Sequence, residues 1–420
     1  MPYYTYEFSQ YGIGPYLPES ETSPNALYVD TDTRKFTQEV RIASPDNKFL
    51  EWVVGGYFTH EATDEQVNLL DNAYPTGDLP APYSSYPFYG YLPSTYTEEA
   101  AFGDATYYIT PSFDITGGFR YSHQHQYYGS NLGWLGFGPP YGEIYSYSSR
   151  SNQGVTTYLF NPRYHLTEDS MLYARIASGF RPGGPNFVLP PSYDSPAPAQ
   201  FQPDKIWNYE IGEKSQLFDN RVLLDADLYD IEWYHIQTTQ NVNGINQLVN
   251  AGNARVRGAE ANFSYRVTEP LTISAAAAWT DAHLITKAPV LGVYYTGARL
   301  PLSPKFNFSV NATYNIVFGN EFSASANIND VWVGARTSGY YGSATDVMYR
   351  MPSYNTTNLN FALYAPDNIE VDLYVKNLFD SEGQLSANTL NNAFFANAPV
   401  PVAITQPRTI GLEFKYTFND

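Results

Sequence analysis

The chain shows strict alternation of apolar and polar residues, and the stretch 407–418 shows it best. Every second residue from Ile410 to Phe418 is apolar, and the residues between them are polar or small. A period of two is typical of a β-strand, which points successive side chains to opposite faces. No helical period competes with it. About sixteen segments are predicted strands: 2–9, 35–44, 50–60, 95–110, 112–125, 152–167, 170–180, 205–218, 221–238, 249–268, 271–284, 304–316, 320–334, 354–364, 368–379 and 407–418.

The connections between these segments are alternately short and long. The short ones are 45–49, 111, 168–169, 219–220, 269–270, 317–319 and 365–367. The long ones, rich in Tyr, Gly and Pro, are 10–34, 61–94, 126–151, 181–204, 239–248, 285–303, 335–353 and 380–406. This predicts an antiparallel up-and-down meander with tight turns at one rim and long loops at the other. An even strand number is expected to place both termini at the rim of the short turns.

The two faces of the predicted strands differ in chemistry. In 368–379, Ile369, Val371 and Leu373 alternate with Glu370 and Asp372. Apolar residues outside and charged residues inside fit a transmembrane β-barrel with a wet lumen. No apolar run reaches the eighteen or so residues of a membrane helix. We therefore expect an all-β, antiparallel transmembrane barrel with about sixteen strands visible.

Composition supports strands and turns and removes several function classes. Tyr occurs 39 times, Gly and Pro 30 times each, and charged residues make up 15%. The net charge of −19 argues against nucleic-acid binding, because no basic stripe is present to meet phosphates. The absence of cysteine excludes disulfides, thiolate metal sites and Cys nucleophiles.

Several stretches resemble the barrel of a TonB-dependent outer-membrane receptor of Gram-negative bacteria. Val-Lys-Asn-Leu-Phe-Asp at 375–380 is similar to the family's penultimate-strand motif, and 407–418 is similar to its closing strand. The segment 173–186, ending Gly-Phe-Arg-Pro-Gly-Gly-Pro-Asn, is similar to a strand-to-loop passage of the family, as are 207–215, 250–260, 297–301 and 36–44.

The resemblance implies a location, a function and partners. Members import a scarce small-molecule nutrient such as a ferric siderophore, cobalamin or a glycan, using a TonB box, a plug domain and a barrel of twenty-two strands. Residues 1–420 are expected to be an incomplete outer-membrane barrel domain without plug or TonB box. The implied partners are outer-membrane lipid and lipopolysaccharide, the barrel-assembly machinery through 407–418, and the TonB system through the missing plug region. The alternative is a passive porin-like channel of sixteen strands.

Residue chemistry points to binding and not to catalysis. His123 and His125 share a face, but two imidazoles without a third ligand make a thin metal site. The glycine-rich stretch 179–186 has no following helix to receive a phosphate. No enzyme activity, cofactor or metal is predicted. The lumen candidates from face parity are Arg120, Tyr173, Arg175, Asp225, Asp227, Glu370 and Asp372, and the loop candidates are Tyr89, Tyr128, Trp134 and Arg181.

Overall fold

The alternating segments of the sequence pair in chain order into one antiparallel sheet of sixteen strands in a computed structural model. The structure describes residues 5–6, 25–47, 49–71, 88–134, 145–188, 198–242, 245–318, 322–340, 348–366, 368–387, 389 and 400–418. Among these residues, no helix has the length and apolar character needed to cross a bilayer. The only helical turn that they contain is η4, Pro289–Leu291. The predicted all-β, up-and-down arrangement is therefore confirmed.

The main sheet is built from strands of unequal length. In order they are β1 (Thr5–Tyr6), β2 (Asn25–Ala43), β3 (Leu50–Asp71), β4 (Phe88–Thr110), β5 (Phe113–Trp134), β6 (Tyr145–Thr167), β7 (Ser170–Arg181), β10 (Asp204–Leu217), β11 (Val222–Tyr234), β14 (Ala254–Arg266), β15 (Leu271–Leu284), β16 (Phe306–Phe318), β17 (Phe322–Val333), β20 (Tyr354–Ala365), β21 (Ile369–Lys376) and β24 (Thr409–Tyr416). Each predicted strand has one counterpart here.

Five predicted strands are too short at the rim of the long connections. Strands β2 to β6 have 19 to 23 residues and reach into 25–34, 61–71, 88–94, 126–134 and 145–151, which were expected to be loops. Of the predicted strand 2–9, only Thr5 and Tyr6 are among the described residues, and they pair with Ala26 and Asn25. That pairing lies at the long-connection end of β2.

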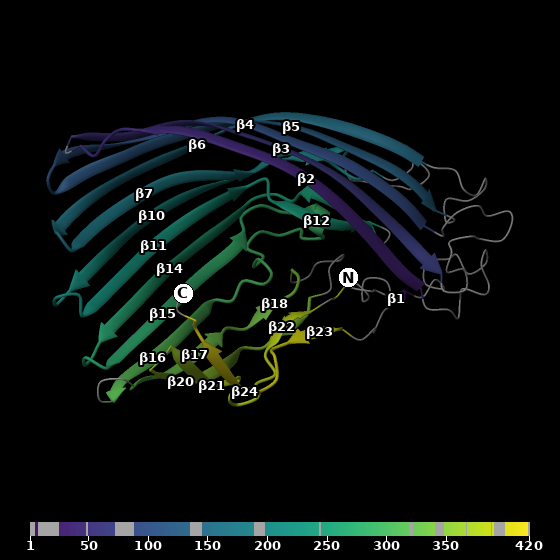
Figure 1. Cartoon of the computed structure of the whole chain (residues 1–420). Helices are drawn as coiled ribbons and strands as arrows, with labels where there is room; N and C mark the ends of the chain where they lie inside the picture. The colour runs from purple at the N-terminus through teal and green to yellow at the C-terminus, as the bar shows by residue number, and fades with distance from the viewer. Residues whose placement is uncertain are drawn as a thin grey trace.

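Short turns and long connections occupy opposite rims, as predicted. In Figure 1 the short turns lie along the left side of the sheet and the long connections along the right. The long connections carry small hairpins: β8 (Gly184–Pro185) with β9 (Gln200–Phe201), β12 (Gln237–Val242) with β13 (Ile245–Asn250), β18 (Arg336–Thr337) with β19 (Arg350–Met351), and β22 (Gln384–Ala387) with β23 (Val402–Ile404). The predicted strand 221–238 therefore ends in β12, and the predicted strand 249–268 begins in β13.

The sheet is curved but its two edges do not meet within the described residues. Figure 1 shows an arch that runs from β2 to β24. Strands β1 and β24 end the strand order, and no pairing joins them. Because an unpaired strand edge leaves its backbone N–H and C=O groups free, both edges are places where further strands can pair.

The strand register sorts side chains onto two faces. The polar face is the one that carries Arg120, Asp227 and Asp372, and the apolar face carries Leu228 and Leu412. The apolar face is open: Leu228 is 58% exposed and Leu412 is 72% exposed. Polar residues are covered instead, and both Ser122 and Gln124 on the polar face are fully buried. This distribution is the reverse of that in a water-soluble protein.

Glycines on the polar face allow tyrosine rings to lie flat against the sheet. Tyr173 lies over Gly212 on the neighbouring strand, and a Cβ on Gly212 would come within 2.6 Å of the tyrosine hydroxyl. Tyr374 lies over Gly411 in the same way. Large rings thus cover the backbone without projecting from the polar face.

A small apolar core lies among the long connections and not within the sheet. It joins the ends of β14 and β15 to the following loops through residues such as Ala254, Leu284, Val293 and Tyr340. This core packs the loops of the long-connection rim against the ends of these strands.

Candidate functional site

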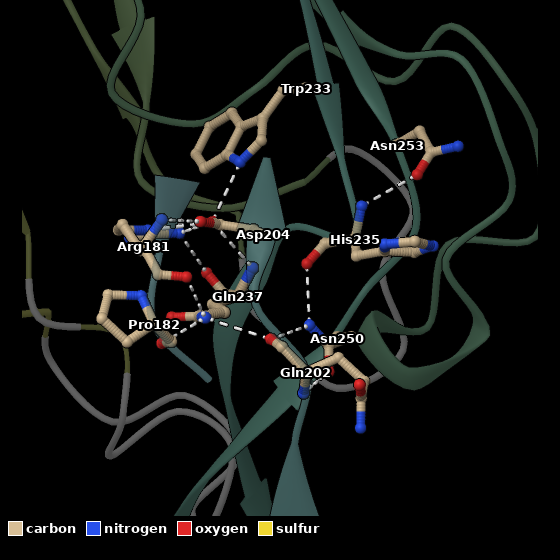
Figure 2. Close-up of polar contacts among 9 residues, drawn as sticks. All are labelled: Arg181, Pro182, Gln202, Asp204, Trp233, His235, Gln237, Asn250 and Asn253. Atoms are coloured by element: carbon tan, nitrogen blue, oxygen red, sulfur yellow. Dashed lines mark hydrogen bonds and ion pairs between the residues drawn. The ribbon is translucent and has the colours of Figure 1, made fainter. Parts of the chain in front are cut away.

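A buried carboxylate organises the long-connection rim. Asp204 is the first residue of β10 and is 2% exposed. Its Oδ2 accepts hydrogen bonds from Arg181 Nε at 2.8 Å and from Trp233 Nε1 at 3.0 Å, and its Oδ1 accepts one from the Arg181 backbone N–H at 3.1 Å. The Arg181 guanidinium also lies 5.3 Å from the Trp233 ring centre. Figure 2 shows these groups converging on Asp204.

The same contacts set the protonation state of Asp204. Burial alone raises the pKa of this carboxyl, but the hydrogen bonds from Arg181 and Trp233 outweigh it and hold the pKa below its ordinary value. Asp204 is therefore an anion at neutral pH, paired with a cation that is half exposed.

Side-chain amides extend this network to the adjacent connections. Gln237 Nε2 donates to the carbonyl oxygens of Pro182 at 2.8 Å and Gln202 at 3.1 Å. Asn250 Nδ2 donates to Gln202 O at 3.0 Å and to His235 O at 2.7 Å. These amides occupy the ends of the β12–β13 hairpin (Figure 2), so the hairpin and the connection between β7 and β10 are joined by hydrogen bonds.

The glycine-rich stretch folds back over the polar face of β5 and β6. Gly183 N–H donates to Gln153 Oε1 at 3.0 Å, and Gln126 Nε2 donates to Gly183 O at 2.5 Å. A Cβ on Gly183 would come within 2.3 Å of Phe201 O, so only glycine fits there. The stretch is a tightly held connection, as the sequence predicted.

The predicted lumen residues all lie on the polar face. Arg120 Nη2 donates to Glu98 Oε1 at 2.7 Å and its guanidinium lies 5.0 Å from the Tyr57 ring centre. Arg120 and Arg175 line the same hollow of about 450 Å³. That any of these residues contacts a ligand stays a prediction.

Tyr173 on β7 and Asp225 and Asp227 on β11 lie on the two strands that flank β10. Tyr173 donates from its hydroxyl to Glu210 Oε1 at 2.7 Å. Lys214 Nζ is 2.9 Å from Asp225 Oδ2 and 5.9 Å from the Tyr173 ring centre. Lys214 and Asp225 border a second hollow of about 670 Å³ nearer the short turns. Glu370, which is 3.3 Å from Lys415 Nζ, and Asp372 are remote from this group, on β21.

Three of the four predicted loop residues lie in strands and not in loops. Tyr89, Tyr128 and Trp134 belong to the long strands β4 and β5, because those strands continue beyond their predicted ends. Tyr89 has the apolar-face parity, opposite to that of Tyr128. The side chain of Trp134 lies outside the described part of the chain. Only Arg181 belongs to the hydrogen-bonded rim network.

Sequence reasoning missed the residues that hold the rim together. Asp204, Trp233, Gln237 and Asn250 come from separate strands and meet only through tertiary contacts. The sequence offered one indication of this role for Asp204, which is its place at the point where a long connection enters a strand.

The described residues contain no group of three metal-ligating side chains. The rings of His123 and His125 lie 4.4 Å apart, and His125 Nδ1 is 2.7 Å from Asn152 Oδ1. The histidine pair therefore has an amide neighbour in place of a third metal ligand.

Comparison with known proteins places this geometry in context. A family model described as TonB dependent receptor-like, beta-barrel, matches residues 2–378. The pesticin receptor of Yersinia enterocolitica is 28% identical over 391 residues, covering 91% of this chain and 51% of the receptor. The metal-pseudopaline receptor CntO of Pseudomonas aeruginosa is 28% identical over 234 residues, covering 56% of this chain and 30% of CntO.

Solved structures show the same architecture. The ferric yersiniabactin uptake receptor FyuA from Yersinia pestis has a TM-score of 0.76 at 20% identity, covering 94% of this chain and 56% of FyuA. The ferric-catecholate import receptor Fiu from Escherichia coli K12 in its closed form has a TM-score of 0.66 at 19% identity, covering 93% of this chain and 54% of Fiu. The chain spans about half the length of the relatives that match it along most of its length.

Proposed function

Because the chain belongs to the TonB-dependent receptor-like β-barrel family, we propose that it forms much of the barrel wall of an outer-membrane receptor for a scarce nutrient. The observation that carries this proposal is the exposed apolar face. Apolar side chains cover one face of the strands and stay open, while the opposite face holds ion pairs such as Arg120–Glu98. Lipid outside and water inside satisfy both faces.

We propose a metal–chelate complex as the ligand class. The names of the matched receptors refer to ferric yersiniabactin, ferric catecholates and a metal–pseudopaline complex, and none refers to a passive porin. A ligand of this kind would meet the rim network around Asp204 first and the polar face with Arg120 and Arg175 next. Both regions offer hydrogen-bond donors and cations in a chain of net charge −19.

The role is that of a receptor and transporter wall with no covalent chemistry. The matched relatives are receptors, in line with the expectation of no enzyme activity. We propose the TonB system, the barrel-assembly machinery acting on 407–418, and outer-membrane lipid as partners, on the basis of family membership.

Membrane insertion and ligand binding test the proposal separately. The full chain, exported to the outer membrane, should fractionate there and require detergent for extraction. In detergent, ferric yersiniabactin and ferric citrate should be tested for quenching of tryptophan fluorescence, with the iron-free chelators as controls. Quenching by one ferric complex and not by its chelator alone supports the receptor. A chain that stays dispersed in buffer without detergent contradicts it.

A further inference from the structure

The last strand of the sheet pairs with a strand to which no tight turn connects it. β21 and β24 lie side by side (Figure 1), from Ile369 opposite Tyr416 to Lys376 opposite Thr409, and the chain between them contains the β22–β23 hairpin. In a hairpin such as β10–β11 the short turn fixes which residues stand opposite each other. A long connection gives no comparable constraint, so the register of β24 on β21 depends on other contacts.

The alternation of apolar residues does not exclude a shift of β24 by two residues. A shift of one residue would turn every apolar side chain of β24 to the polar face, but a shift of two keeps each on its own face. Leu373, which stands opposite Leu412, would then stand opposite Phe414. Val375 would in turn take Leu412 as its partner, so the pairs on the apolar face would stay apolar.

The charges on the polar face favour this shifted register. In the observed register Asp372 stands directly opposite Glu413, and like charges in this position destabilise a strand pair. The neighbour of Asp372 on β20 is Ala362, which supplies no cation. The shift would place Asp372 opposite Lys415 and so separate the two carboxylates. Lys415 now lies 3.3 Å from Glu370, so the shift would exchange one ion pair for another and relieve one repulsion.

One contact within the strand pair opposes the shift. The ring of Tyr374 covers Gly411, where an added Cβ would collide with it. The shift would place Glu413 beneath this ring and force the ring into another position. The strand pair alone thus has one contact that favours the observed register and one repulsion that disfavours it.

The sequence motif at 375–380 supplies a further constraint. Asn377 and Asp380 have positive φ angles of 51° and 55°, so the chain turns sharply directly after β21. Asn377 is 4% exposed, and its Nδ2 donates to Gln406 O at 2.8 Å. Asp380 Oδ1 accepts a hydrogen bond from the backbone N–H of Arg408 at 2.7 Å. Both bonds hold the backbone immediately before β24.

The motif is also fixed to the strand on the other side of β21. The Asn377 backbone N–H donates to Asn358 Oδ1 at 2.9 Å, and the Leu378 backbone N–H donates to Thr357 O at 2.8 Å, both toward β20. A strand rises about 3.4 Å per residue, so a shift of two would move the start of β24 by about 7 Å along β21. Such a movement breaks both bonds between the motif and the start of β24.

We propose that Asn377 and Asp380 fix the register of β24 on β21 and exclude the shifted register. Because β24 ends the strand order, its position also sets where a further strand can pair with the free edge. Closure of a barrel depends on a fixed stagger between its strands, so a single register at this edge is required for closure. The inference depends on the pairing of the described strands and not on the ligand proposed above.

Disulfide trapping measures the register, because the chain contains no cysteine of its own. Leu373→Cys/Leu412→Cys reports the observed register, and Leu373→Cys/Phe414→Cys reports the shifted one. Residues directly opposite each other are near enough for a disulfide, whereas diagonal ones are about 7–8 Å apart. The full chain is oxidised in detergent micelles, and mass spectrometry counts the disulfide in each reporter. With the motif intact, only the first reporter should form it.

Removal of the two side chains should release the register. Asn377→Gly/Asp380→Gly deletes both of them and leaves the positive φ angles without strain. The ratio of the shifted to the observed disulfide should rise about tenfold or more, as expected for the loss of two hydrogen bonds. Asp380→Asn keeps the Oδ1 acceptor and should stay near the wild-type ratio. Glu382→Ala is the matched control, since Glu382 is an exposed carboxylate of the same connection.

Asp372→Asn distinguishes a change of register from a general loss of stability. It removes both the repulsion in the observed register and the ion pair of the shifted one. Added to the double glycine variant, it should lower the shifted disulfide toward the wild-type level. A double glycine variant that folds and forms only the observed disulfide overturns the inference. A double glycine variant that lacks heat-modifiable mobility on gels and is not restored by Asp372→Asn also overturns it, because the motif would then serve folding in general.

Discussion

At the residue scale, Asp204 shows how one buried group fixes several connections. Its two carboxylate oxygens accept hydrogen bonds from β7, β11 and the start of β12, and each donor belongs to a different stretch of sequence. Removing the charge leaves those donors without their common acceptor, and the cost of an unsatisfied buried donor exceeds the value of an average hydrogen bond.

Asp204→Asn should therefore lower the free energy of unfolding by about 1–3 kcal/mol. The amide keeps the shape of the carboxylate but presents a donor to Arg181 and Trp233. Urea unfolding in detergent micelles, followed by tryptophan fluorescence, measures the change. Asp46→Asn is the matched control, because Asp46 lies in a short turn and is exposed. A loss no larger than that of the control would show that Asp204 does not hold the rim.

The pH dependence of stability gives a second test of Asp204. Its pKa in the folded chain lies below the ordinary value, so the unfolded chain binds its proton first as pH falls. The stability that Asp204 contributes is complete above the ordinary value of about 3.9 and is lost as pH falls through the lower folded pKa. The difference in stability between the wild-type chain and Asp204→Asn should thus shrink below about pH 4. A difference that stays constant from pH 7 to pH 3 would contradict this assignment.

The sequence allowed the sheet face of each strand residue to be predicted, but it did not allow its hydrogen-bond partners to be predicted. Parity along a strand is local, so Arg120, Tyr173 and Asp225 could be assigned to one face without knowledge of the fold. The partners Asp204 and Trp233 are 29 residues apart, and no local pattern connects them.

At the element scale, the packing of a tyrosine ring over a glycine on the neighbouring strand predicts that a larger residue in place of the glycine destabilises the sheet. Gly212→Ala places a methyl group 2.6 Å from the Tyr173 hydroxyl and should displace the ring from Glu210. Such overpacking should lower the free energy of unfolding by about 1–3 kcal/mol, measured as for Asp204. Gly117→Ala is the control, since nothing lies within 4 Å of the added methyl group. The double variant Tyr173→Leu/Gly212→Ala should recover part of the loss. Equal effects at the two glycines would rule out the clash.

The assignment of the apolar face predicts unequal tolerance to charge on one strand. Leu373 is 48% exposed on the apolar face of β21, and Asp372 beside it lies on the polar face. Leu373→Arg should cost about 2–4 kcal/mol if that face meets lipid, whereas Asp372→Arg should cost far less. The yield of folded, heat-modifiable protein in the outer membrane compares the two variants. Similar yields would mean that β21 has no lipid-facing side.

The ends of β2 to β6 could not be predicted because the alternation changes phase there. Along most of β2 the apolar residues, such as Val40 and Ile42, lie on the apolar face. Near its start, Asp30 and Asp32 have that parity, and Val29 has the parity of the polar face. A search for one continuous apolar face stops where the phase reverses, although the backbone pairing continues. The reversal is expected where a strand passes from lipid into water.

At the scale of the whole molecule, the meander, the family resemblance and the incomplete barrel that it implies were predictable, but the curvature was not. The order of short and long connections fixes which strands are neighbours, and the motif at 375–380 is local. Whether the edges at β1 and β24 meet depends on strand number and tilt over the whole sheet. That information is not present in any single segment.

The opposite rims also predict how the molecule is oriented in a membrane. If the long connections face the outside of the cell, an epitope tag inserted after Tyr295 should be labelled by antibody on intact cells, because Tyr294 and Tyr295 are exposed in the connection between β15 and β16. A tag between Asp219 and Asn220, in the turn between β10 and β11, should be labelled only after the outer membrane is permeabilised. Both insertions fall in exposed turns or loops, which tolerate added residues well. Each tagged chain must also run as a heat-modifiable band, so that labelling reports orientation and not unfolding. Labelling of the 219–220 tag on intact cells, with protection of the Tyr295 tag, would invert the topology and place the Asp204 network on the periplasmic side.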